Sequence, residues 1–241
     1  MHWRYTDATA PVCVYLDTDD PALSEYRALD LPPDWTIHIG ERAPYNPVWH
    51  INNRHYAQFP NQPWYGHIND DMVPRRYHWD RELIETAGAN LIAYGDDLLQ
   101  GRRMCTFPVI GGDLVRRVGR LMFDGINIDT AWMLLGFKYG LLRYRPDIIL
   151  EHLHWTNGKA PKDDTYGYVD EAIQHGGTVE ALEAFVRFVL DPKTAALVKY
   201  GPQPVGETCY CGRRNNLMDC VFPSCGGRAV ADPRVIEAEG D

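Results

Sequence analysis

The chain lacks any apolar run long enough to span a bilayer, and its first residues, MHWRYTDATAP, lack the pattern of a secretory signal. It has only 6 cysteines in 241 residues, placed too unevenly for a disulfide scaffold, with Cys13 and Cys105 each alone among apolar residues. Internal repeats and low-complexity tracts are also absent. We therefore expect a cytoplasmic protein without a membrane partner, built as one large domain with at most a small appendage.

Positive charge is also scarce. The sequence has 24 Lys and Arg against 33 Asp and Glu, which gives a net charge of −9. This balance argues against a broad surface that binds nucleic-acid phosphates, although it leaves room for a local basic groove.

Short apolar runs alternate with helical patterns along most of the chain. We predict strands at 12–17, 35–40, 64–70, 90–97 and 147–155. We predict helices at 22–29, 46–59, 79–88, 111–121, 128–140, 178–190 and 191–201. Alternation of this kind favours an α/β fold with a Rossmann-like sheet. The expected organisation is a domain over 1–200, a cysteine-rich appendage over 201–230 and an acidic tail over 231–241.

The segment YGHINDDMVP places Asn69, Asp70 and Asp71 in a row at the end of a predicted strand. Ligands of open α/β sheets bind at the carboxyl ends of strands. Carboxylates grouped there repel one another unless a cation lies between them, and a divalent metal with phosphate oxygens is a common solution. The alternative is that Asp70 and Asp71 only cap the following turn.

Other charged residues follow predicted strands in the same way. These are Asp17 and Asp19, Arg42, and the pair His152 and His154. Two residues apart in a strand, the two histidines are expected on one face. Imidazole together with carboxylate suits Mn²⁺ better than Mg²⁺ alone.

Asp129 opens a strongly apolar predicted helix in GINIDTAWMLLG. One interpretation is an N-cap of that helix. The other is a general base, since a carboxylate at a helix start beside a metal-bound leaving group can accept a proton.

The order of these segments resembles the GT-A fold glycosyltransferases, in particular family-2-like enzymes of phage and actinobacterial genomes. The matching stretches cover about residues 12 to 166 and are VYLDTDDPALSEY, GHINDDMVPRRYHWD, FPVIGGDLVRRVG, GINIDTAWMLLGFKYGLLRYRPDIILEHLHW and GKAPKDD. The resemblance implies a GT-A mixed sheet flanked by helices, and an inverting transfer from a nucleotide-sugar donor with Mn²⁺ or Mg²⁺ as cofactor.

The resemblance also implies roles for single residues. Asp71 would be the direct metal ligand, with His154 or His152 as the later one, and Asp129 would be the base. The implied donor-binding residues are Asp17, Asp19, Arg42, Asn69, Asp70, Gly111, Gly112 and Lys159. Among these, Lys159 would cover the diphosphate, and the two glycines would let the backbone approach the donor sugar or acceptor closely.

One departure from the family concerns the beginning of the chain. Relatives usually carry a further strand and helix before the segment that corresponds to VCVYLD, and this sequence starts shortly before it. We expect either an upstream start, a weakened donor site, or completion of the site by another chain in a homo-oligomer or a complex.

Four cysteines gather near the end of the chain in CYCGRRNNLMDCVFPSCGG. Cys209, Cys211, Cys220 and Cys225 fit a tetrahedral Cys₄ Zn²⁺ site, and tight loops with few apolar side chains favour such a structural ion. The alternative is four reduced surface thiols.

Three functions fit these patterns. The leading one is the metal-dependent inverting glycosyltransferase, with a hydroxymethylated pyrimidine in DNA as one candidate acceptor and envelope glycans or small molecules as others. A nucleotidyltransferase would need the same sheet, carboxylates and metal. A non-catalytic, zinc-stabilised nucleic-acid-binding protein is the third, and the net charge argues against it.

Overall fold

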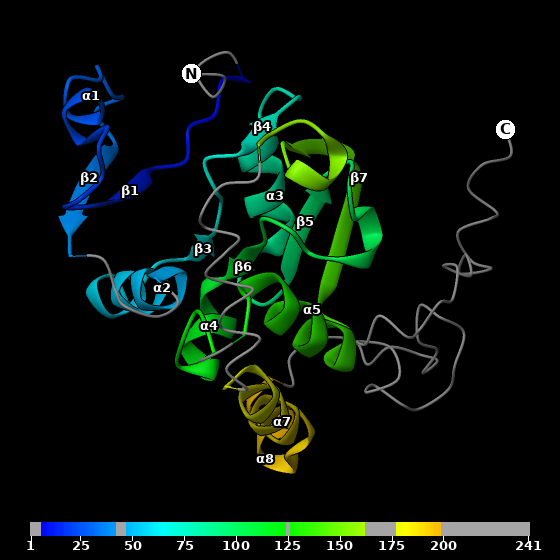
Figure 1. Cartoon of the computed structure of the whole chain (residues 1–241). Coiled ribbons are helices and arrows are strands. Elements are labelled where there is room, and N and C mark those ends of the chain that lie inside the picture. Colours follow the sequence, from blue (N-terminus) through cyan, green and yellow to red (C-terminus); the bar gives the residue numbers. More distant parts are fainter. Residues whose placement is uncertain (1–5, 42–46, 124–125, 162–176, 199–241) are drawn as a thin grey trace, which may run out of the picture.

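The structure, a computed structural model, describes residues 6–41, 47–123, 126–161 and 177–198. Its strands are β1 (Val12–Asp17), β2 (Trp35–Gly40), β3 (Trp64–Gly66), β4 (Met72–Pro74), β5 (Ile92–Asp96), β6 (Val109–Gly111) and β7 (Leu142–His152). Its α-helices are α1 (Leu23–Arg27), α2 (Pro47–Gln58), α3 (Trp79–Ala87), α4 (Gly112–Val118), α5 (Ile128–Tyr139), α7 (Gly177–Leu190) and α8 (Pro192–Val198). Short 3₁₀ turns are η2 (Gly101–Arg103) and η3 (Trp155–Asn157). The class is mixed α/β, as predicted (Figure 1).

The larger sheet has five strands in the order β3-β6-β5-β7-β4. β5 and β7 are parallel, and the other three pairings are antiparallel. β4 and β6 were not predicted, because three residues are too few to show the alternation that marks a strand. β7 begins at Leu142, before the predicted start at 147, and ends at His152.

β1 and β2 form a separate, two-stranded parallel sheet. The expectation of one continuous sheet is therefore wrong for the described residues, in which no strand pairs with the outer edge of β1. In Figure 1 this pair and α1 stand apart from the larger sheet, and α2 lies below the pair. α2 contacts both sheets through His55. The His55 Nδ1 atom is hydrogen-bonded to the hydroxyl of Tyr15 in β1, at 2.9 Å, and the centroid of the His55 ring lies 6.2 Å from that of Tyr65 in β3.

Helices cover both faces of the larger sheet, since side chains of β5 alternate between two apolar clusters. Ile92 and Tyr94 pack in the cluster that includes α5, whereas Ala93 packs with Leu83 of α3. Trp132 of α5 is fully buried, and its Nε1 donates to the Leu121 carbonyl at 2.7 Å. α7 and α8 join the first cluster through buried apolar side chains, Phe185, Val189 and Val198.

Several predicted helix ends are confirmed. Gly88 ends α3 with a positive φ of 50°, and the Asp191 carboxylate accepts from the Lys193 amide at the start of α8. Asp80, which stands near the start of the predicted helix over 79–88, is not the N-cap of α3; His78 is. Asp80 is buried in the first turn and accepts from the amides of Thr9 and Ala10 at 2.6 and 2.7 Å, so it fixes the N-terminal segment instead. None of the described helices combines the length and apolar character that crossing a bilayer requires.

Candidate active site

Asp71 and His152 are brought together by the pairing of β4 with β7. Met72 lies opposite His152 in the register, and the Leu153 amide donates to the Asp71 carbonyl at 2.9 Å. The Asp71 Oδ2 and His152 Nε2 atoms are consequently 2.9 Å apart. Asp71 Oδ1 and His152 Nδ1 are buried and have no hydrogen-bond partner in the structure. Buried polar atoms usually have a partner, so this pair offers two atoms for a ligand.

The charge state of His152 is set by competing effects. Burial lowers its pKa, but the hydrogen bond that the imidazole donates to Asp71 and the negative charges of Asp71, Asp97 and Asp129 outweigh burial and raise the pKa above its usual value. The neighbouring carboxylates therefore stabilise the protonated form of His152.

The prediction that His152 and His154 share one face of a strand is wrong, because β7 ends at His152 and His154 lies beyond it. Its Nδ1 accepts from the Thr156 amide at 3.2 Å and caps η3. The rings of the two histidines are nevertheless 5.0 Å apart, and burial and the neighbouring His152 lower the pKa of His154. His154 is therefore adjacent to the pair but is oriented by its own turn.

Asp129 lies in the first turn of α5, which begins at Ile128. The N-cap of α5 is Asn127, so the interpretation of Asp129 as the N-cap is wrong; its Oδ1 accepts from the Thr130 amide at 2.7 Å within the first turn. Burial raises the pKa of Asp129, while hydrogen bonds from Thr130 and the charge of His152 counteract part of the rise. Asp129 and His152 are thus within electrostatic reach of each other.

Asn69 and Asp70 are exposed on the loop that leads to Asp71. Burial lowers the pKa of His67 to about 4, and a hydrogen bond with Asn69 only partly offsets this effect. His67 is consequently neutral at neutral pH. Burial raises the pKa of Tyr26 in α1, and the negative charges of Asp70, Asp20 and Glu25 add to this rise.

Lys159 is held by Glu151 of β7. The Lys159 ammonium forms an ion pair with Glu151 Oε1, and Arg75 contacts the other oxygen of the same carboxylate. Lys159 and Arg75 lower the pKa of Glu151 by hydrogen bonds that favour its charged form. Lys159 would have to leave this buried carboxylate to reach a diphosphate.

Gly111 and Gly112 have a packing role. A Cβ built on Gly111 would lie 2.2 Å from the Ala89 carbonyl carbon, and one on Gly112 would lie 2.0 Å from the Gln62 carbonyl oxygen. The close approach lets Ala89 accept hydrogen bonds from the Asp113 and Leu114 amides at the start of α4. The space beside these glycines is filled by the protein's own backbone, which argues against the predicted ligand contact.

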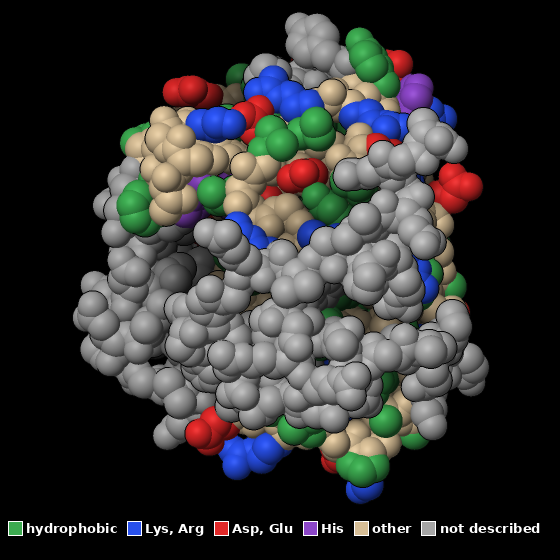
Figure 2. Space-filling model, turned by 90° about the vertical axis from the view of Figure 1, so that its right-hand side faces the viewer, with side chains coloured by type: hydrophobic (Ala, Val, Ile, Leu, Met, Phe, Trp, Pro, Cys, Tyr) green, Lys and Arg blue, Asp and Glu red, His purple; other side chains and the backbone are tan. Residues whose placement is uncertain are grey.

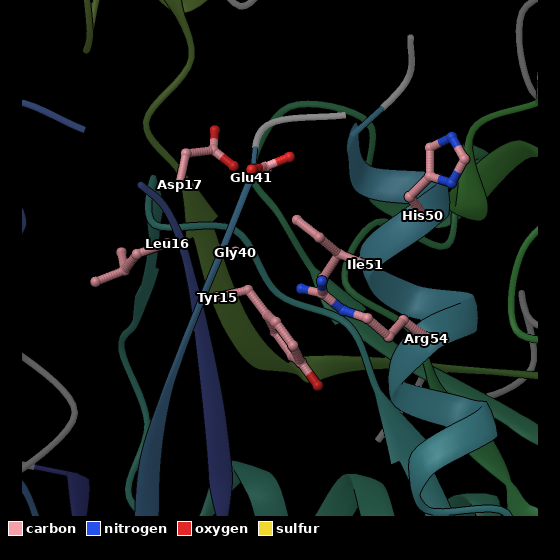
Figure 3. A pocket seen from close by; sticks show the side chains of 8 residues that line it. All are labelled: Tyr15, Leu16, Asp17, Gly40, Glu41, His50, Ile51 and Arg54. Atoms are coloured by element: carbon pink, nitrogen blue, oxygen red, sulfur yellow. The ribbon is translucent and has the colours of Figure 1, made fainter. Parts of the chain in front are cut away.

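A cavity of about 260 Å³ lies at the carboxyl ends of β1 and β2 (Figure 3). Asp17, one of the predicted donor-binding residues, lines it, whereas Asp19 does not. The other lining residues come from both strands, the residue after β2, and α2: Tyr15, Leu16, Gly40, Glu41, His50, Ile51 and Arg54. This is the edge at which ligands of parallel strands bind.

Within the described ranges, no three His, Cys, Asp or Glu side chains are arranged as a ready-made metal site. Asp71 and His152 alone supply two donor groups. Ions such as Mg²⁺ are commonly held by one or two carboxylates together with phosphate oxygens of the substrate. The pair therefore fits an ion that binds together with a diphosphate. Arg42 and the predicted zinc ligands, Cys209, Cys211, Cys220 and Cys225, lie outside the described residues.

The sequence analysis did not assign His67, Cys105, Glu41 or Arg54 to the site. Cys105 is buried and its Sγ donates to the Asp129 carbonyl at 3.1 Å, and burial raises its pKa so that the thiol stays protonated. Glu41 follows a predicted strand directly, so the strand-end rule would have found it. The other three depend on contacts with segments distant in sequence, which a single sequence does not show.

Comparisons with known proteins found no match. No family model matches the sequence, and no match was found among curated proteins or solved structures.

Proposed function

We propose that the protein is a metal-dependent inverting glycosyltransferase that moves a sugar from a nucleotide-sugar donor to a hydroxyl acceptor. The observation that carries this proposal is the 2.9 Å contact between Asp71 and His152 at the end of β7, within electrostatic reach of Asp129. A metal-binding carboxylate, an imidazole and a second carboxylate with a raised pKa are the groups that the reaction needs. The GT-A arrangement of the sheet is part of the same proposal.

Each residue then has a chemical task. Asp71, through its unpartnered Oδ1, and His152, in its neutral form, are the residues that would hold Mn²⁺ or Mg²⁺. When bound, the ion offsets the negative charge that builds up on the leaving diphosphate. Asp129 accepts the proton of the acceptor hydroxyl at its carboxylate. Its raised pKa makes it a stronger base than an exposed aspartate, and therefore better suited to this step.

The cavity at the ends of β1 and β2 would hold the nucleoside. Its volume of about 260 Å³ is slightly below the range of roughly 300–1,000 Å³ that is typical of pockets for whole ligands, so it suits one part of the donor. The charge of Asp70, in the loop before β4, contributes to the raised pKa of Tyr26 in α1, which follows β1. A donor that extends from the cavity toward Asp71 would span these two regions.

The proposal does not specify the acceptor; a hydroxymethylated pyrimidine in DNA is one candidate. On the face shown in Figure 2, the described Lys and Arg side chains are interspersed with Asp and Glu side chains. This mixture gives the nucleic-acid-binding alternative no support from that part of the chain.

Release of nucleoside diphosphate from a nucleotide sugar, with water as acceptor and Mn²⁺ present, tests the proposal. Asp129→Asn retains the oxygen that accepts from Thr130 but cannot take up a proton, so turnover should fall about 10²- to 10⁴-fold. Asp113→Asn is a matched control, because Asp113 also lies in the first turn of a helix, α4, and should leave turnover unchanged.

The dependence on pH provides a second readout. Asp129 must be ionised to act as the base, so turnover of the wild type should rise as the pH passes its raised pKa and then level off. Full turnover in Asp129→Asn, or wild-type turnover in excess chelator, would overturn the proposal.

A further inference from the structure

The smaller sheet contacts the larger one through a histidine of α2. The Nδ1 atom of His55 is hydrogen-bonded to the hydroxyl of Tyr15 in β1 at 2.9 Å, and the two rings meet edge to face with their centroids 6.0 Å apart. The same imidazole lies 6.2 Å from the ring of Tyr65 in β3 and 5.1 Å from the ring of Phe59, which follows α2. His55 is therefore packed between the two sheets, with its side chain partly buried.

A second imidazole and a guanidinium lie beside the same tyrosine. The ring of His38 in β2 stacks on that of Tyr15, with centroids 4.9 Å apart and an angle of 21° between the ring planes. The guanidinium carbon of Arg54 lies 5.4 Å from the centroid of the Tyr15 ring, and Figure 3 shows this side chain extending from α2 toward β1 and β2. A proton on His55 would therefore add positive charge close to that of Arg54.

The described groups that face His55 include no carboxylate. Its hydrogen-bond and ring partners are aromatic, and the neighbouring group that acts on its charge is another imidazole, that of His38. The titratable and charged groups that surround it on β1, β2, β3 and α2 are Cys13, Tyr15, His38, Arg54, Tyr56 and Tyr65. A proton on His55 thus gains no counter-charge from these elements, unlike a proton on His152, which lies against Asp71.

We propose that the docking of the smaller sheet on α2 is sensitive to acid: the β1–β2 pair is held in place while His55 is neutral and loosens when His55 is protonated. A neutral imidazole with its proton on Nε2 accepts from the Tyr15 hydroxyl at Nδ1. In the protonated form both ring nitrogens are donors, so this hydrogen bond would have to reverse, and a partly buried charge would lie near Arg54. The cavity is lined from β1, β2 and α2, so loosening of this contact would open it.

The direction of the pH dependence follows from the pKa of His55. Burial lowers this pKa, and the neighbouring His38 lowers it further. The docked state therefore binds the proton less readily than an undocked state, in which an exposed imidazole has a pKa of about 6.5. Docking is strongest above that pH and weakens as the pH falls through it toward the lower pKa of the docked state. One proton can change the docking equilibrium by at most about tenfold per pH unit.

Hydrogen exchange of the full chain, followed by mass spectrometry of peptic fragments at about pH 5 and about pH 7.5, tests the proposal. Exchange is expressed as protection factors, which remove the direct effect of pH on the exchange rate. Fragments from β1 and β2 should have protection factors at least about threefold lower at the lower pH, while those from β5 and α5 should change little.

Two variants identify the titrating group. In His55→Gln the amide oxygen can still accept from Tyr15 but is not protonated in this pH range, so the difference between the two pH values should disappear. His50→Gln is the matched control, because His50 is an exposed histidine of the same helix, and this variant should retain the wild-type difference.

Equal protection of β1 and β2 at both pH values in the wild type would refute the proposal, as would an undiminished difference in His55→Gln. If the glutamine loosens the sheet at both pH values, His55→Phe takes its place, since it keeps a ring against Tyr65 and Phe59 and has no titratable nitrogen. A pH difference that survives in that variant would equally overturn the proposal. A loss of protection that includes β5 and α5 would show global unfolding in acid and contradict local release of the sheet.

Discussion

The substitution Gly111→Ala tests whether this glycine packs the fold or contacts a ligand. The added Cβ would lie 2.2 Å from the Ala89 carbonyl carbon, 2.4 Å from its oxygen and 2.4 Å from the Asn90 nitrogen. All three are backbone atoms, so no side chain can rotate to make room. β6 and the 89–90 segment must separate instead.

The expected loss in the free energy of unfolding depends on the hydrogen bonds that this separation weakens. The Gly111 amide donates to Leu91 at 2.9 Å, and the Ala89 carbonyl accepts from Asp113 at 3.0 Å. Overpacking of a buried site typically costs about 1–3 kcal/mol, and each weakened hydrogen bond adds about 1 kcal/mol. We expect Gly111→Ala to lower the free energy of unfolding by at least about 2 kcal/mol. For a chain of this size that corresponds to a fall in Tm of roughly 4–8 °C or more.

Urea and thermal unfolding followed by circular dichroism measure this loss. Gly66→Ala is the matched control, because Gly66 lies in β3, which pairs with β6, and its Cβ would meet only side-chain atoms at 3.7 and 3.8 Å. It should change stability by less than about 0.5 kcal/mol, as surface substitutions usually do. A Gly111→Ala variant that is as stable as the wild type but has lost nucleotide binding would refute the packing argument.

Two further predictions concern the carboxylate–imidazole pair and the cysteines. The pKa of His152 is raised in the folded state, so the stability contributed by its interaction with Asp71 is fully present below the unfolded pKa and is lost as the pH rises through the folded pKa. Asp71→Asn should therefore cost about 1.5 kcal/mol or more in urea unfolding at about pH 5.5 and clearly less at about pH 9, and equal losses would contradict this. Elemental analysis should find about one zinc per chain, lost in the double variant Cys220→Ser, Cys225→Ser, and a zinc-free wild type would exclude the site.

The sequence by itself determined the local elements. β1 and β2 have the predicted bounds residue for residue, and α2, α3 and α5 lie within one residue of their predicted ends. These features depend on neighbours in the chain, such as Gly88 with its positive φ and Pro192 at the first position of α8. Asp71 and His152 are neighbours in space, but the strand-end rule does not explain the position of Asp71: the strand predicted over 64–70 ends at Gly66, and Asp71 directly precedes β4.

Only the tertiary structure decided how the elements pair. The register that places Met72 opposite His152, and so Asp71 on its imidazole, joins residues about 80 positions apart in a β4 strand of three residues. The division into two sheets and the packing of Gly111 on Ala89 are set in the same way, by backbone contacts between distant segments. Side-chain periodicity indicates which face of an element is buried. It does not indicate the partner strand, because many registers bury the same face.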